Sequence, residues 1–415
     1  MKYIENLKTK TAFEIIFIAT VVLSFLLWIT YICIDGSSSP QFNMFFQRCE
    51  DFMADSTNVL GYSAGRDPYH NLLHGLEEKA YPPLTYAIMY LISRVVDVNA
   101  IVQKDNNYFY IYNNLQYLTI LVIFLILLLL LMYTLIQVTK NGNMAVKTMT
   151  ALALCCSAPM LYSIERANTI IFTVILCMFF LFYYNSENKV LRELTLIALA
   201  IAAAFKMTPA LLGIMLLYNK QFKEASRTVI YGIIMVFGPF IFLHGGFSNA
   251  PLMFQNMKLN LQAYSSIEGC TLAASLNRFG QTFMNGFILP DMIIAIMKIV
   301  TVLTSILLLA VVPFLKFNWE KVAAVVLVLI ILPSHSGTYC ILYMIPVIVM
   351  FLNEEKHRNI DFLYLFCFIM ISWDFICPAT YIFNFNLAIP IMVIALSITG
   401  LINIKKVCWR DYGNK

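Results

Sequence analysis

The sequence has little charge. Only 12% of its 415 residues are Asp, Glu, Lys or Arg, against about a quarter in soluble globular proteins. Hydrophobic residues make up 60% of the chain, and the mean hydropathy is +0.76. The apolar residues recur in long blocks up to the C-terminus, which leaves no window for a separate water-soluble domain. These features exclude a cytosolic enzyme, a disordered chain and a fibrous protein, and they predict a multi-pass membrane protein.

The sequence also lacks a concentrated basic stripe and a metal-ligand motif. The net charge is +5, but the basic residues are spread thinly through short loops, which argues against a nucleic-acid partner. No cysteine pair has zinc-ligand spacing, so we expect neither a disulfide framework nor a metal site, and no cofactor. Six of the ten cysteines lie in apolar runs: Cys155, Cys156, Cys177, Cys340, Cys367 and Cys377.

The apolar runs predict an all-α membrane bundle. A spanning helix needs about 20 mostly apolar residues, and runs of that kind cover 11–34, 115–138, 228–244, 291–315, 362–383 and 387–404. Shorter runs cover 83–96, 148–164, 169–185, 194–205, 209–218, 322–334 and 339–352. We expect about 11–13 membrane helices, several of them short or broken, in a single domain over 1–415. The first run is too long for a secretory signal and is predicted to be a retained span.

The distribution of basic residues predicts the orientation. If the N-terminus is cytoplasmic and 83–96 dips into the membrane without crossing it, the inner segments hold 18 of the 28 basic residues. These segments are 1–10, 139–147, 185–193, 219–227, 316–321, 353–361 and 405–415. The two long loops, 35–82 and 245–290, then lie outside together with the polar breaks of the short runs. We therefore expect a site on the outer face of the plasma membrane, with 35–82 as its catalytic loop.

Two carboxylates in the first outer loop are candidates for a general base. Asp51 and Asp55 are four residues apart, so on a helix they would share one face. A carboxylate that is partly desolvated near a membrane has a raised pKa and can accept a proton at working pH. The alternative is that both acids are solvated or pair with Arg48.

The same loop contains two further polar motifs. The segment from Arg66 and Asp67 to Tyr69 predicts a turn, in which Pro68 fixes φ and Asp67 can close an Asx-type hydrogen bond. Tyr81 is followed by two prolines at the start of an apolar run, which fits an extended entry into a membrane helix. Each motif is common in membrane proteins.

Charged residues also interrupt the apolar runs. Lys206 stands between two apolar segments, followed by Pro209. A charge within a membrane segment indicates a functional site, although a lysine that reaches out to the interface is the alternative. Glu165, Arg166 and Asn168 lie between two other runs, where they form either a ligand site or a local ion pair in a tight hairpin.

A third polar break contains His335. A lone histidine is more often structural. If His335 converges with the lysine and arginine of the other breaks on one outer cavity, the three would form an anion site, in which the arginine binds phosphate bidentately. Asn277 and Arg278 of the second outer loop could add to it.

Taken in order, these motifs resemble the integral-membrane glycosyltransferases of the GT-C superfamily, in particular the bacterial branch of polyprenyl-phosphate-mannose-dependent mannosyltransferases. The similarity covers about residues 10–260, with weaker support from 333–346. The matching segments are Asp51-Phe52 with Asp55, Gly65-Arg66-Asp67-Pro68-Tyr69, Tyr81-Pro82-Pro83-Leu84, Glu165-Arg166-Ala167-Asn168 and Phe205-Lys206-Met207-Thr208-Pro209.

The resemblance implies a donor, an acceptor and a mechanism. A polyprenyl-phosphate sugar, such as a mannosyl donor, would load from the membrane lipids, and a glycan or glycolipid of the cell envelope would accept the sugar with inversion. Asp51 or Asp55 would deprotonate the acceptor. Lys206, Arg166 and His335 would contact the carrier phosphate, and no metal would be needed.

Two other functions remain open on the sequence. A transporter or lipid flippase would need polar groups that reach both faces of the membrane and two related halves, whereas here the polar breaks gather on one side without an evident repeat. A polymerase or ligase of lipid-linked glycans would be expected to carry its main Arg and His residues in a long C-terminal outer loop. Here the first loop is the richer one, which favours the glycosyltransferase.

Overall fold

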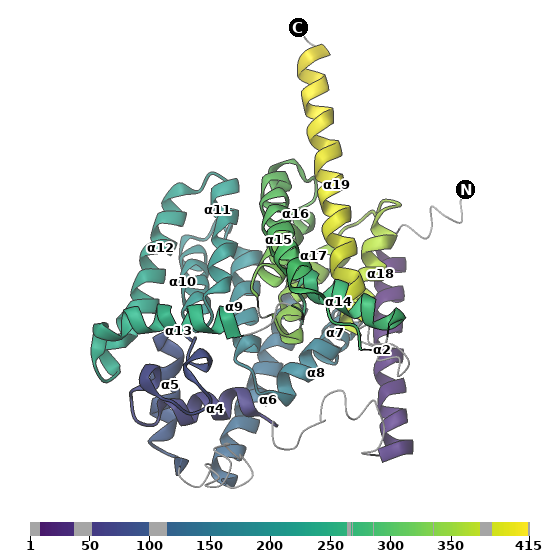
Figure 1. Ribbon diagram of the computed structural model, residues 1–415. Coiled ribbons are helices and arrows are strands. Elements are labelled where there is room, and N and C mark those ends of the chain that lie inside the picture. Colours follow the sequence, from purple (N-terminus) through teal and green to yellow (C-terminus); the bar gives the residue numbers. More distant parts are fainter. Residues whose placement is uncertain are drawn as a thin grey trace. The chain divides into compact units, whose positions relative to one another are not determined.

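The computed structural model describes residues 9–36, 52–98, 114–263, 267, 269–284, 286–334, 336–373 and 384–413 (Figure 1). Within these ranges the regular elements are all helices, and the β-type pairing is a single isolated bridge. The predicted all-α fold is confirmed. The chain divides into two compact units. The first unit comprises Met1–Met44, Ile136–Met160 and Ser266–Lys415, and the second comprises Phe45–Leu135 and Leu161–Ser265.

Five helices in the described ranges are long and apolar enough to cross a membrane. They are α2 (Lys10–Asp35), α6 (Leu115–Thr139), α12 (Phe222–Phe237) with η8 (Gly238–Phe242), α15 (Asp291–Val311) with η10 (Val312–Phe314), and α19 (Asn384–Gly413). Five of the six predicted long runs are thus confirmed as helices of spanning length. The sixth, 362–383, is helical only in α18 (Asp361–Ser372), and 374–383 lie outside the described residues.

The shorter runs form short or broken helices, as predicted. One bent pair counts as a sixth span: α7 (Met144–Cys155) and α8 (Ala158–Glu165), at 51° to each other. The others are α5 (Pro83–Ser93), α9 (Ile170–Tyr183), α10 (Lys189–Phe205), η7 (Thr208–Gly213) with α11 (Ile214–Tyr218), α16 (Asn318–Ile331), and η11 (Thr338–Met344) with α17 (Ile345–Leu352). At 11 residues α5 is about 16 Å long, against a hydrocarbon core of about 30 Å, which fits the expected dip.

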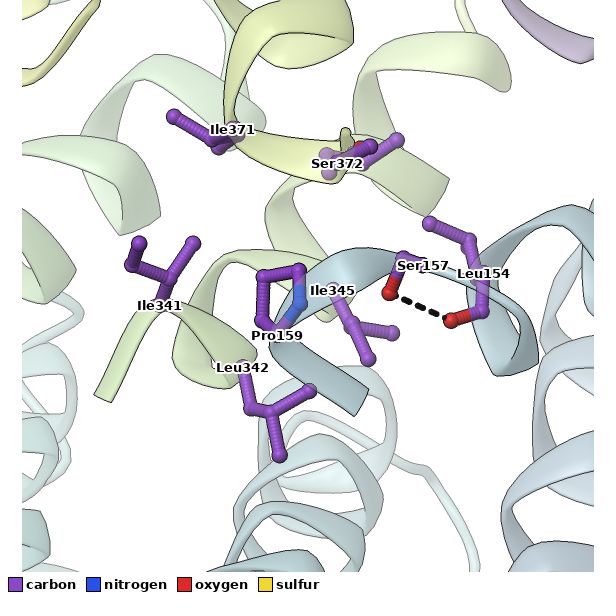
Figure 2. Close-up of a pocket in the computed structure, with 9 residues that line it drawn as sticks. Leu154, Ser157, Pro159, Ile341, Leu342, Ile345, Ile371 and Ser372 are labelled. Atoms are coloured by element: carbon purple, nitrogen blue, oxygen red, sulfur yellow. Dashed lines mark hydrogen bonds between the residues drawn. The ribbon is translucent and has the colours of Figure 1, made fainter. Parts of the chain in front are cut away.

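The first unit is built around α16, in which every residue from Val322 to Ile331 is buried. A buried ion pair, Lys140 Nζ to Glu14 at 2.5 Å, connects the end of α6 to α2. Lys140 also donates to the carbonyl of Leu352 at the end of α17. A small apolar cavity lies beside the end of α7, lined by residues such as Leu154, Ile341 and Ile371 (Figure 2). Its volume is about 10 Å³, room for about one water, so it is too small for a sugar.

In the second unit, α9 and α10 form an antiparallel hairpin, and α12 packs along α10 (Figure 1). The rings of Phe172 and Phe205 meet at one end of the hairpin, with centroids 5.0 Å apart. At the other end Asn219 donates to the Tyr184 hydroxyl at 2.7 Å. We call these the Lys206 end and the Lys189 end. They are about 25 Å apart, the length of the 17 residues of α10.

Short elements gather at the Lys206 end. They are α4 (Ala54–Ser63), η3 (Pro68–His70), η4 (Leu76–Glu78), η9 (Gly246–Asn249) and α13 (Ala250–Ala263). The start of α5 is attached to the end of α10, because the Thr85 hydroxyl donates to the carbonyl of Phe205 at 3.2 Å. Asn260 of α13 donates to the carbonyl of Glu77. Residues from the first predicted outer loop therefore lie beside Lys206.

Candidate active site

The centre of the candidate site is an ionic cluster between α4 and the turn that follows α8. The Oδ1 atom of Asp55 accepts two hydrogen bonds from Arg166, at 3.1 Å from Nε and 2.7 Å from Nη2. Its Oδ2 atom accepts a third from the amide of Asn168 at 2.5 Å. The side chains of Asp55 and Arg166 are each 18% exposed. The structure thus brings three predicted site residues together from two segments that are 111 residues apart.

Backbone contacts hold these two segments in register. The Met53 amide donates to the carbonyl of Glu165 at 2.8 Å, and the Ser56 hydroxyl donates to the carbonyl of Ala167 at 2.6 Å. Met53 and Ala167 both adopt positive φ, 56° and 47°, which is costly for residues other than glycine. The surrounding hydrogen bonds keep this strained arrangement in place, and they fix Asp55 at the start of α4.

The turn itself is shaped by Asn168, whose side chain has two functions. Its Oδ1 atom accepts from the amide of Ile170 at 2.9 Å, and thereby caps the start of α9, while its Nδ2 atom binds Asp55. Asn168 is 1% exposed and Glu165 is 6% exposed. Arg166 pairs across the sequence with Asp55, so the motif does more than close a local hairpin.

The structure describes one of the two candidate acids, Asp55. The helix α4 begins at Ala54, and the left-handed Met53 precedes it. Asp51 itself lies outside the described residues.

The hydrogen bonds of Asp55 fix the orientation of its carboxylate. A carboxylate has about four lone-pair sites, and Arg166 and Asn168 occupy three of them. Among the described residues, the second lone-pair site of Oδ2 has no further hydrogen-bond donor.

Lys206 terminates α10, as the sequence indicated. Its backbone is extended, with φ −143°, and η7 follows with Pro209 in its first turn. The Lys206 Nζ atom lies 5.3 Å from the ring centroid of Tyr81, an arrangement that stabilises a cation. Lys206 and Asp55 both belong to the second unit, and both lie at the end of the hairpin where α10 stops and α9 starts.

Tyr81 and Tyr69 form an aromatic cluster at the entry to α5. The Tyr69 hydroxyl donates to the carbonyl of Tyr81 at 2.9 Å, and its ring meets that of Tyr86 edge to face at 5.3 Å. Tyr69 is 1% exposed, and burial raises the pKa of its hydroxyl. Pro83 begins α5, as predicted. This cluster supports the ring on which Lys206 lies.

Arg66 and Asp67 point elsewhere. The Nε atom of Arg66 donates to the carbonyl of Phe242 at 2.8 Å, and its guanidinium lies over Tyr90. Asp67 begins the turn at η3, as expected, but its carboxylate forms no capping hydrogen bond. It pairs instead with His70 at 2.7 Å on an exposed surface. The Asx-type bond predicted for Asp67 is wrong, because the histidine three residues later competes for the carboxylate.

Three residues near Asp55 were missed by the sequence: Tyr62, Glu78 and Lys79. Lys79 is fully buried, donates to the carbonyls of Leu73 and Gly75, and lies 3.9 Å from the ring centroid of Tyr62. Burial lowers the pKa of Lys79 to about 8, opposed by the charges of Glu78 and Glu77. No sequence signal marks this lysine, since a Glu-Glu-Lys run ordinarily indicates a solvated loop.

Glu78 extends the charged cluster of Asp55. Burial is the main cause that raises the pKa of its carboxyl, and the charge of Lys79 opposes this. Asp55 raises the pKa of Glu78 further and Arg166 lowers it, so the three groups lie within electrostatic reach. Burial also raises the pKa of Tyr62, with Glu78, Tyr81 and Asp55 adding to the effect. Tyr62 therefore lies within electrostatic reach of both Asp55 and Tyr81, and the Tyr81 ring in turn lies next to Lys206.

Three other candidates belong to the first unit or lie outside the described residues. His335 lies outside the described residues. Asn277 and Arg278 belong to α14 (Leu272–Phe283) of the first unit, where Asn277 accepts from the Leu289 amide and Arg278 donates to Gln281. Across the described ranges, which omit Asp51 and His335, no group of three or more His, Cys, Asp or Glu side chains is placed to hold a metal ion.

Comparison with known families decides the class of the protein. Residues 80–334, more than half of the chain, match the family model described as glycosyltransferase family 87. The chain belongs to this family. No curated protein and no solved structure matches it significantly. The family is GT-C-like, so the superfamily prediction is confirmed, and the protein is a multi-pass membrane glycosyltransferase. The match includes Tyr81, Arg166 and Lys206, whereas Asp55 precedes it.

Proposed function

We propose that the protein transfers a hexose, such as mannose, from a polyprenyl-phosphate donor to a cell-envelope glycan or lipid, with inversion. The observation that carries the proposal is the cluster of Asp55, Arg166 and Asn168 at the same hairpin end as Lys206, in a chain of glycosyltransferase family 87. One acid and separate cations are the groups that such a transfer requires. The orientation predicted from the basic residues puts this end on the outer face of the plasma membrane.

The acid would act on the acceptor. In a single displacement the acceptor oxygen attacks the anomeric carbon, the bond from that carbon to the phosphate oxygen breaks, and the acceptor proton passes to the base. The open position on Oδ2 suits Asp55 for this step, and Asp51 remains the second candidate. Arg166 and Asn168 would position Asp55, because they fix both of its oxygens.

The cations would act on the donor. A phosphate leaves readily once its developing charge is matched, so a partner acid is not required. Lys206 stands beside the aromatic Tyr81, a surface suited to a sugar or prenyl group next to a phosphate. Arg166 binds Asp55 with two of its five donors, and its positive charge would also act on the phosphate. His335 stays a prediction for the same role.

The test separates chemistry from donor binding. Wild type, Asp51→Asn and Asp55→Asn are purified and supplied with radiolabelled polyprenyl-phosphate mannose and an extract of envelope glycolipids. We expect all three to bind the donor, and at least one variant to lose transfer by more than 100-fold. The control is Asp97→Asn, an exposed acid of the same unit. Normal transfer by both site variants would show that neither acid is the base.

A further inference from the structure

The Lys189 end of the second unit contains an open pocket with charged and apolar side chains in its lining, at the opposite end of α10 from the candidate active site. Its volume is about 440 Å³, and it is lined by Lys189, Val190, Arg192, Glu193, Leu194 and Arg227. This volume is within the range of about 300–1,000 Å³ for small-molecule sites. The residues come from the first two turns of α10 and from α12, about 25 Å from Lys206 along α10.

Two acids fix one of the arginines of this pocket. Arg227 donates to Glu193 at 2.5 Å and to Glu224 at 3.1 Å. Glu224 also lies 3.8 Å from Arg192. The two acids thereby neutralise two arginines and hold α12 against α10. One positive charge in the pocket is left without compensation, that of Lys189.

Lys189 and Arg192 retain donors for a ligand. Within the described part of the chain, the side chain of Lys189 has no hydrogen-bond or ion-pair partner, and the guanidinium of Arg192 has only the 3.8 Å approach to Glu224. Both open onto the pocket. A guanidinium and an ammonium side by side suit a phosphate, the first as a planar fork and the second as a point charge.

The surroundings of the pocket select a lipid rather than a soluble anion. Exposed apolar side chains line the pocket and continue beyond it on α12: Val190 is 69% exposed, Leu194 51% and Ile230 54%. The segment Phe222–Phe242 is long and apolar enough to span a membrane, so its first turn lies where the chain leaves the hydrocarbon. A ligand with a phosphate in the pocket could lay acyl chains along these side chains.

We propose that this pocket binds the phosphate of an anionic phospholipid, with Lys189 and Arg192 as the contacts. The predicted orientation puts it in the cytoplasmic leaflet, where anionic lipids attract basic residues near helix ends. This lipid site is separate from the transferase site and does not depend on the identity of the sugar donor.

The test measures how much lipid the protein retains when basic side chains are removed from the pocket, and when one is removed beside the pocket. Wild type, Lys189→Ala/Arg192→Gln and the control Lys223→Ala are purified in a neutral detergent and mixed with equal amounts of phosphatidylglycerol and phosphatidylcholine, and bound lipids are counted by native mass spectrometry. Lys223 is exposed in the same basic segment but does not line the pocket. We expect the double variant to retain at least fivefold less phosphatidylglycerol, and Lys223→Ala to retain as much as wild type.

Three results would overturn the proposal. One is equal retention of the two lipids by wild type, and another is an equal loss in Lys223→Ala, which would indicate surface potential alone. The third comes from a melting experiment: if millimolar inorganic phosphate stabilises wild type and phosphatidylglycerol does not, the ligand is a soluble phosphate. Unchanged melting of the double variant in detergent alone shows that it still folds, as expected because Lys189 is exposed and the Arg192 side chain is 28% exposed.

Discussion

The two ends of the α9–α10 hairpin both contain acids paired with arginines, but the pairs differ in kind. At the Lys206 end, Asp55 and Arg166 are 111 residues apart and each 18% exposed. At the Lys189 end, Arg227 and Glu193 are 34 residues apart, with side chains 40% and 28% exposed. The segments that carry the first pair are held together by two hydrogen bonds, and each segment contains one residue with a left-handed backbone. The second lies on two adjacent helices. Enclosure and strain therefore distinguish the candidate catalytic end from the candidate lipid-binding end.

The largest effect is expected from Arg166→Met. It leaves the Asp55 carboxylate partly buried with Asn168 as its hydrogen-bond partner, and breaking such a pair costs about 3–5 kcal/mol when it is fully buried. At 18% exposure we expect about 2–3 kcal/mol and more than 100-fold loss of transfer. Melting in detergent and initial rates measure the two effects.

A double-mutant cycle sharpens this result. Combined with Asp55→Asn, the Arg166→Met substitution should cost less stability than alone, with a coupling of about 1–3 kcal/mol. Additive effects would mean that the pair does not hold the site together.

The next effect concerns Lys206. A hydrogen bond to a charged group contributes about 1.5–3 kcal/mol, so Lys206→Ala should raise the KM for the donor about tenfold or more, with a smaller change in kcat. Lys206→Arg should restore part of the affinity. Steady-state kinetics with polyprenyl-phosphate mannose measures this, and Lys223→Ala at the opposite end is the charge-matched control. An unchanged KM in Lys206→Ala would remove this lysine from the donor site.

A smaller effect is a pH dependence that arises from Lys79. Its pKa falls from 10.5 to about 8 on folding, so between these values the unfolded chain binds more protons than the folded one. Stability must then rise with pH in that window, and below pH 8 the burial cost of the charge is fully present. Relative to Lys79→Met, wild type should gain melting temperature from pH 8 to pH 10. A parallel pH profile of the two proteins would contradict the burial of a charged amine.

The smallest effect is expected at the Lys189 end. Arg227→Gln breaks two partly exposed ion pairs on adjacent turns and helices; exposed pairs contribute about 0.2–1 kcal/mol each, so the melting temperature should change less than in Arg166→Met. Raising the salt concentration should diminish the effect further. A loss as large as that of Arg166→Met would mean that the two ends do not differ as described.

The sequence predicted those features that depend on apolar runs and local rules. The long helices follow from the length of the apolar runs. The end of α10 follows from the charge of Lys206 with a proline nearby, and the start of α5 follows from the geometry of Pro83. The sequence also selected Asp55, Arg166 and Asn168 as candidates, through the order of motifs in a family. It left open whether Arg166 has a local partner, because pairing across 111 residues depends on the tertiary fold.

The failed expectations arose from geometry that has no local signal. Met53 adopts a left-handed backbone directly before α4, which the sequence does not indicate for a methionine. His70 takes the carboxylate that was expected to cap its own turn. Lys79 lies in a charged run that appears solvated on the sequence, yet the fold covers it completely.

The long separation between Asp55 and Arg166 has a consequence for biosynthesis. When the ribosome has made α4, the arginine that will receive Asp55 has not been synthesised, and α6 must enter the membrane before the turn after α8 emerges. We expect the carboxylate to remain hydrated during this interval and the site to close late. A nascent chain that stalls before Arg166 would therefore carry the acid without the partner that orients it.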